Sequence, residues 1–95
     1  MITVVMVRHL LQEREKDAAR LLGELRRREI QQNGCISSEI LWSVDDPSMW
    51  IDISTWTYSD QWKKWEVALE HRDIESEMQN LLVAADKASI FKIVK

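Results

Sequence analysis

The order of elements along this 95-residue chain predicts an α+β fold of the ferredoxin-like type, β-α-β-β-α-β, built on an antiparallel sheet. Three observations support this prediction. A helical repeat of apolar residues follows an extended N-terminal run; the polar turn Asp45-Asp46-Pro47-Ser48 joins two further extended runs; and Gly34 and Pro47 stand at expected junctions. The length suits a single domain over residues 1–95.

The first half of the chain predicts a strand followed by a helix. Residues 2–9 are mostly β-branched or apolar, which is typical of a strand. Residues 13–32 predict a helix, because apolar side chains recur at the spacing i, i+3, i+4 and i+7 from Ala18 to Leu25. Gly34 is expected to end this segment, since glycine readily adopts the left-handed conformation that follows a helix.

The second half predicts two strands, a helical region and a closing strand. The strands cover residues 35–44 and 49–57, and Ser59 suits the N-cap of the next helix. Trp62, Trp65 and Leu69 share one helical face, but the next apolar stripe, which starts at Ile74, does not line up with it. We therefore expect a break near residues 71–73, and a last strand over residues 87–94.

The central strands are apolar on both faces, which predicts a homodimer. The usual strand order of this fold puts the first and third strands in the middle of the sheet. Val5 and Val7 lie on one face of the first strand, and Met49, Ile51 and Ile53 lie on one face of the third. Two helices cover only one face, and a soluble monomer rarely exposes a large apolar patch. We therefore expect two copies to pack sheet against sheet.

The other face of the third strand predicts a pocket. It interleaves Trp50 and Trp56 with Asp52 and Ser54. A buried carboxylate is costly without partners, so these polar groups suggest a polar-lined space between sheet and helices. The alternative is that Asp52 lies near the end of the sheet and is solvated. Trp56, Trp62 and Trp65 form either ordinary core or a slot for a planar aromatic ligand.

His9 and His71 are the only histidines, and so they are candidates for proton transfer near neutral pH. Taken alone, each is more often a surface or rim histidine than a catalyst. No spacing of His, Cys and carboxylates indicates a metal site, and no nucleophile motif or phosphate-binding loop occurs. The sequence therefore predicts a site without metal or cofactor.

Charge and hydropathy exclude some partners. A net charge of −3 and a pI near 5.3 argue against binding to a phosphate backbone. The longest apolar run near the N-terminus, residues 4–7, is too short for a membrane span or a signal peptide. Cys35 is the only cysteine, which fits a reducing compartment, and we expect a cytoplasmic protein in which Cys35 packs at the start of a strand.

These motifs together resemble the antibiotic biosynthesis monooxygenase family of dimeric α+β barrels. The resemblance covers nearly the whole chain. It depends on Asn33-Gly34-Cys35 leading into a strand, the turn Val44-Asp45-Asp46-Pro47, a third strand that ends at Trp56, and Trp65 nine residues later.

Two branches of that family suggest different activities. Cofactor-independent monooxygenases oxidise polycyclic phenols with dioxygen, and the resemblance places Asp52, Trp56 and Trp62 at their site positions, with Asp52 in place of an amide. Heme-degrading members match at Trp65 but need an Asn near the end of the first strand and a His where this chain has Glu75. The resemblance therefore disfavours heme degradation.

Two hypotheses for function follow. In the first, the chain is a cofactor-independent monooxygenase for a small planar phenol or quinol. Its tryptophans hold the ring, and Asp52 or His71 takes the phenolic proton, which makes an electron-rich anion. In the second, the chain is a non-catalytic dimer that binds a small hydrophobic molecule.

Overall fold

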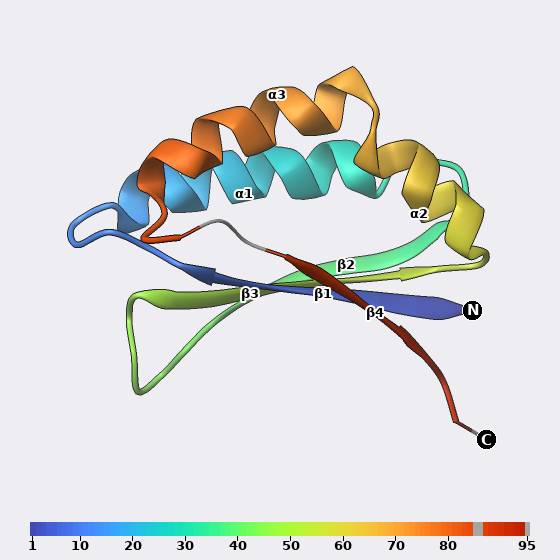
Figure 1. The fold of residues 1–95 in the computed structure, drawn as a ribbon, viewed down its shortest axis with the longest axis horizontal. Helices are drawn as coiled ribbons and strands as arrows, with labels where there is room; N and C mark the ends of the chain where they lie inside the picture. The colour runs from blue at the N-terminus through green and yellow to red at the C-terminus, as the bar shows by residue number, and fades with distance from the viewer. Residues whose placement is uncertain (85–86, 95) are drawn as a thin grey trace.

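The structure, a computed structural model that describes residues 1–84 and 87–94, contains the predicted antiparallel sheet (Figure 1). Its strand order is β2-β3-β1-β4, so the first and third strands lie in the middle as expected. The strands are β1 (Ile2–His9), β2 (Cys35–Trp42), β3 (Met49–Trp56) and β4 (Ala88–Lys92).

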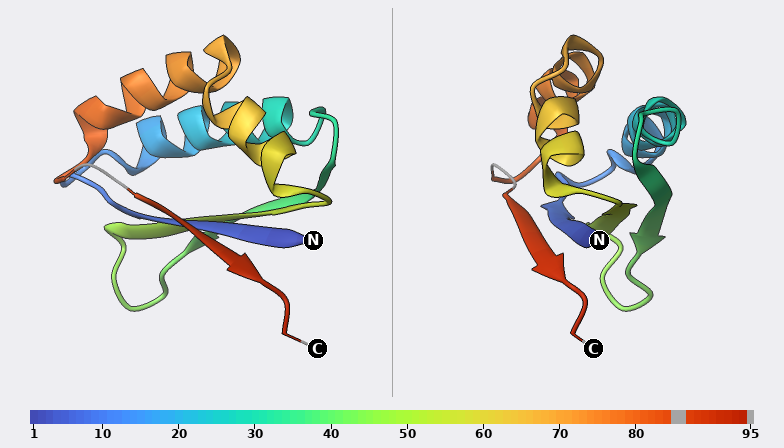
Figure 2. Two further views of the ribbon diagram at one scale, coloured as in Figure 1. Left: turned by 45° about the vertical axis from the view of Figure 1, so that its right-hand side comes forward. Right: turned by 90° about the vertical axis from the view of Figure 1, so that its right-hand side faces the viewer.

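All the helices lie on one face of this sheet, as the two views in Figure 2 show. They are α1 (Glu15–Glu29), α2 (Ser59–Glu66) and α3 (Leu69–Met78), followed by the short 3-10 helix η1 (Gln79–Leu81). The core fills the layer between helices and sheet, with Trp56, Leu22 and Met78 among its most buried side chains. None of the helices in residues 1–84 and 87–94 combines the length and apolar character needed to span a bilayer.

Strand register decides which side chains face the helices. In the β1–β3 ladder, Met6 lies opposite Asp52 and Arg8 lies opposite Trp50. Directly paired residues share a face, and neighbouring residues alternate between faces. Val4 and Arg8 are accordingly buried under the helices, whereas Val7 is exposed on the outer face.

The outer face of the sheet remains apolar and uncovered in the single chain. Val7, Leu41 and Phe91 keep between 39% and 53% of their surface exposed. Leu41 pairs with Ile51 in the ladder between β2 and β3, so the exposed apolar surface continues across the sheet. This is the face through which the sequence predicts a homodimer.

Three details of the helical region differ from the sequence prediction. The break falls at Val67 and Ala68, three residues before the expected position, because the His71 Nδ1 atom bonds the Glu66 carbonyl oxygen at 3.0 Å and so satisfies the end of α2. The N-cap of α2 is Tyr58 and not Ser59, and the Tyr58 backbone N–H donates to the Gln61 side-chain oxygen at 3.0 Å. Helix α1 is also shorter at both ends than residues 13–32.

Gly34 confirms the expected left-handed turn, with φ at +90°. A Cβ atom there would overlap the side-chain amide of Gln61. We expect Gly34→Ala to lower the free energy of unfolding by about 1–2 kcal/mol, the usual cost of this conformation for a residue with a Cβ. Gly23→Ala is the matched control in urea unfolding: the site is open and helical, so alanine should stabilise by about 0.5–1 kcal/mol. Equal effects of both substitutions would contradict the argument.

Candidate functional site

Arg8 is the centre of a charged cluster in the layer between sheet and helices. Its side chain has no exposed surface. The Nε atom donates to Asp52 Oδ2 at 2.7 Å, and the two terminal nitrogens donate to the Glu75 oxygens at 2.9 and 2.6 Å. Two carboxylates thus compensate the desolvation of one guanidinium. Asp52 is not solvated at a sheet end, because it faces Arg8 beneath the helices.

His71 extends the cluster along α3 toward Trp65. Its Nε2 atom lies 3.4 Å from Glu75 Oε1, and its ring centroid lies 5.0 Å from that of Trp65. The position of His71 follows from the break at Ala68, which starts α3 on a path that turns residues 71 and 75 inward on successive turns. The structure therefore brings His71 and Asp52 into one cluster, linked by Arg8 and Glu75.

Glu29 is a second buried acid, and sequence reasoning did not single it out. Its carboxylate accepts hydrogen bonds from Ser38 Oγ at 2.6 Å and from Trp65 Nε1 at 2.9 Å. It lies at the end of α1 on the same side as Leu22 and Leu25, so the helical repeat was the signal that places it inside. The indole N–H of Trp65 thus has a buried acid as its partner.

These contacts join seven residues from six elements into what we call the buried polar ring. Its members are Arg8, Glu29, Ser38, Asp52, Trp65, His71 and Glu75. Glu29, Ser38 and Asp52 also line one small space between α1 and the sheet, and this space has no room for a water molecule.

Burial and pairing shift the pKa values of the three acids in the buried polar ring in different directions. Burial raises the pKa of Asp52, although Arg8 opposes the shift. Burial also raises the pKa of Glu29, for which Ser38 and Trp65 supply hydrogen bonds but no charge. For Glu75, the hydrogen bonds from His71 and Arg8 outweigh burial and lower the pKa to about 2. Glu75 is therefore the fixed anion, while Asp52 and Glu29 hold protons more strongly than ordinary acids do.

His71 lies between two acceptors, the Glu75 carboxylate and the Glu66 carbonyl oxygen, and both favour the protonated form of its imidazole. Burial opposes a charge on the ring, but the hydrogen bonds to Glu75 and to the Glu66 carbonyl outweigh it and raise the pKa of His71. The carbonyl contact requires a proton on Nδ1. A histidine with a raised pKa and an acceptor at each ring nitrogen is a poorer proton acceptor than an ordinary imidazole, so Asp52 is the better candidate for a general base.

Four of the candidate residues lie outside the ring. His9 is exposed on the outer face of the sheet, because neighbouring residues of a strand point to opposite faces and Arg8 points toward the helices. Trp50 stacks on Trp42 with ring centroids 5.2 Å apart and donates to the Pro47 carbonyl. Trp56 and Trp62 are buried in the core, so they pack the fold and do not form an open slot.

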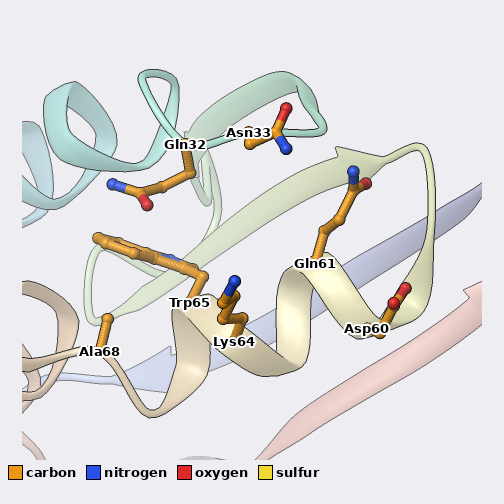
Figure 3. Close-up of a pocket in the computed structure, with 7 residues that line it drawn as sticks. All are labelled: Gln32, Asn33, Asp60, Gln61, Lys64, Trp65 and Ala68. Atoms are coloured by element: carbon orange, nitrogen blue, oxygen red, sulfur yellow. The ribbon is translucent and has the colours of Figure 1, made fainter.

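Trp65 is the one tryptophan of the expected slot that also borders open space in the described structure. A pocket of about 560 Å³ lies between the α1–β2 turn and helix α2. Figure 3 shows its lining, which comprises Gln32, Asn33, Asp60, Gln61, Lys64, Trp65 and Ala68. The volume lies within the range of small-molecule sites. Trp65 thus links this pocket to the buried polar ring through its bond to Glu29.

Metal and thiol chemistry find no support in the described residues. Residues 1–84 and 87–94 contain no group of three or more His, Cys, Asp or Glu placed to hold a metal ion. Cys35 is half-buried, and burial raises the pKa of its thiol to about 11, which keeps it in the unreactive thiol form.

Comparison of the sequence with family models identifies one match. The model described as antibiotic biosynthesis monooxygenase matches residues 1–76, which include every member of the buried polar ring. No curated protein matches the sequence.

Solved structures show the same fold at low sequence identity. A Nitrosomonas europaea protein named for the antibiotic biosynthesis monooxygenases superposes with a TM-score of 0.92 at 12% identity, and the match covers 100% of both chains. A similarly named protein from Deinococcus radiodurans gives 0.92 at 13% identity, over 100% of this chain and 94% of the other.

SnoaB, a cofactor-independent oxygenase from Streptomyces nogalater, gives a TM-score of 0.89 at 13% identity, over 99% of this chain and 93% of its own. The structural likeness supports the fold alone, whereas the family model covers well over half of the sequence. The chain belongs to the antibiotic biosynthesis monooxygenase family.

Proposed function

We propose that this chain is a cofactor-independent oxygenase that acts on a small planar phenol or quinol. The observation that supports the proposal most directly is Asp52, a buried carboxyl group that accepts a hydrogen bond from Arg8 inside the buried polar ring. A carboxylate whose pKa is raised by burial takes up a proton more strongly than a solvated one. Trp65, which is 2% exposed, donates its indole N–H to Glu29 in the same ring and borders the outer pocket at its edge.

The reaction needs only dioxygen and a base. Asp52 takes the phenolic proton, and the resulting phenolate passes one electron to dioxygen. The two radicals combine as a peroxide at a ring carbon, and loss of water leaves a carbonyl there. One oxygen atom of dioxygen enters the quinone product and the other leaves as water. The protein orients the aromatic ring of the substrate and excludes solvent from it.

One observation favours the second hypothesis, a non-catalytic binder. The space beside Asp52, Glu29 and Ser38 is closed in the single chain. The aromatic ring of a substrate can reach Asp52 only if side chains of α1 or Trp65 move when the substrate binds. A binder that holds its ligand in the outer pocket at Trp65 needs no such opening.

We also propose that the protein works as a homodimer through the outer face of the sheet. The exposed apolar side chains of Val7, Leu41 and Phe91 support this arrangement. Packing a second copy against them removes apolar surface from water at about 25 cal/mol per Å².

Oxygen uptake with anthrones and naphthoquinols tests the proposed activity. Quinols also oxidise spontaneously to give hydrogen peroxide, so isotopically labelled dioxygen is used. The proposal expects one labelled atom in the product and a rate proportional to protein concentration. Saturable quenching of tryptophan fluorescence without uptake above the spontaneous rate would instead support the binder. Quenching by heme alone would contradict both the activity and the expected ligand class.

A further inference from the structure

Trp65 closes the layer between sheet and helices toward the outer pocket. The pocket has a volume of about 560 Å³, and Figure 3 shows the indole along its edge, between helix α2 and the turn that follows α1. The indole N–H bonds Glu29, which together with Asp52 lines the small closed space. Trp65 itself is only 2% exposed. A movement of its indole toward the pocket would therefore admit water to Glu29.

Glu29 is poorly placed to carry a charge while this layer is closed. It is the last residue of α1, where the negative end of the helix dipole disfavours an anion. Its two hydrogen-bond partners, Ser38 and Trp65, are neutral, and the space that it shares with Asp52 has no room for water. Burial accordingly raises the pKa of Glu29, and the charge of Asp52 acts in the same direction. An ionised Glu29 is therefore stabilised when water reaches it.

The protonated form of Glu29 satisfies the same contacts as the ionised form. Its Oε1 atom lies 2.6 Å from Ser38 Oγ, and a hydroxyl both donates and accepts, so the carboxyl proton can point at Ser38. The Oε2 atom then still accepts from the Trp65 Nε1–H at 2.9 Å. The closed position of Trp65 thus suits a neutral Glu29 better than a charged one.

We propose that Glu29 is a latch for Trp65: the protonated carboxyl group holds the indole closed over the buried polar ring, and its ionisation releases the indole toward the outer pocket. A rise in pH then both opens the layer that contains Asp52 and ionises Asp52. The inference rests on the proposed function only for what the opening serves, which is access of a substrate to that base. The latch itself needs neither substrate nor oxygen.

Hydrogen exchange of the indole N–H groups, followed by NMR without substrate, tests the latch. The Trp65 signal is identified by its loss in Trp65→Phe, and Trp56 is the reference in the same molecule, because its buried N–H donates to Ser54. A group whose pKa is raised in the closed state stabilises that state at low pH, and this contribution is lost as the pH rises. The ratio of the Trp65 rate to the Trp56 rate should therefore rise above pH 4.5, the ordinary pKa of a glutamate, by up to about 10-fold per pH unit, the limit for release of one proton.

Glu29→Gln isolates the charge from the contacts. The amide is neutral at every pH, its oxygen accepts from Trp65, and its N–H₂ group donates to Ser38, so both hydrogen bonds remain. The ratio of rates should then stay low and lose its dependence on pH. Asp17→Asn, which removes an exposed acid from the same helix, is the matched control and should keep the wild-type dependence.

The other titratable groups around Glu29 give separable responses. His71 faces the indole with 5.0 Å between ring centroids, but its response begins only above its ordinary pKa of 6.5. Asp52 lines the same closed space, and its response begins above its ordinary pKa of 3.8. Solvent screens Asp60 and Lys64, which are exposed on the pocket side. The groups that keep one charge state near neutral pH are Arg8, Arg26, Cys35 and Glu75.

A ratio of rates that does not rise with pH in the wild type, or a rise that persists in Glu29→Gln, would overturn the inference. The outcome is separable from that of the proposed activity. A latch that Glu29→Gln locks, with no labelled oxygen in any product, would keep the inference and exclude the oxygenase. Labelled oxygen in the product, with a ratio that Glu29→Gln leaves unchanged, would keep the oxygenase and overturn the latch.

Discussion

An Arg8→Met variant is expected to lose about 3–5 kcal/mol of free energy of unfolding, the usual cost of removing one partner from a buried ion pair. Methionine fills much of the same volume but leaves the carboxylates of Asp52 and Glu75 without their cation. Both keep only 15% of their side-chain surface exposed, so water replaces little of the lost interaction. Urea unfolding at neutral pH measures the effect.

The loss of unfolding free energy in Arg8→Met should become smaller as the pH falls. His71 and Arg8 together lower the pKa of Glu75 from 4.5 to about 2, and Arg8 also opposes the rise that burial causes in the pKa of Asp52. An acid with a lowered pKa adds stability above its unfolded pKa, and this contribution disappears as the pH falls through its folded pKa. The gap between wild type and Arg8→Met should therefore be widest at neutral pH and narrow as the pH falls from 4.5 toward 2.

Two further variants control this experiment. Arg27→Met removes an arginine that pairs with Glu24 on the exposed side of α1, and little change is expected because solvent screens that pair. Combining Arg8→Met with Asp52→Asn and Glu75→Gln removes the buried charges together and should recover much of the loss. A loss no larger than that of Arg27→Met would contradict the role assigned to Arg8.

An Asp52→Asn variant is expected to reduce kcat for oxidation of a phenol roughly 100- to 10,000-fold, the range for loss of a general base. The amide is isosteric and still accepts the hydrogen bond from Arg8, so the fold and KM should change little. Oxygen uptake measures the rate, and kcat/KM as a function of pH gives the second readout. The wild-type rate should rise with pH as Asp52 loses its proton, and this rise should vanish in the variant.

Asp17→Asn, an exposed acid on α1, is the control for the charge change and should leave the rate unaltered. Unchanged turnover in Asp52→Asn would show that Asp52 is not the general base. Equal ligand binding with no turnover in either form would support the non-catalytic binder.

The layer architecture was predictable because it depends on local periodicity. Alternation along residues 49–56 put Trp50, Asp52, Ser54 and Trp56 on one face, and the structure places that face beneath the helices. The same alternation applied to β1 would have put Arg8 on the same face as Val4 and indicated a buried cation on the face that carries Asp52. The helix break was misplaced because it depends on His71 capping α2, a contact that no apolar repeat encodes.

The sequence by itself determined the elements, their order, the apolar faces and the aromatic character of the layer, because each follows from spacing along the chain. Only the tertiary structure decided which polar groups meet. Arg8 and Glu75 are 67 residues apart and Glu29 and Trp65 are 36 apart, so no local pattern pairs them. Packing chose these partners, since a charge or an N–H group enclosed between sheet and helices is stable only where another element supplies its complement.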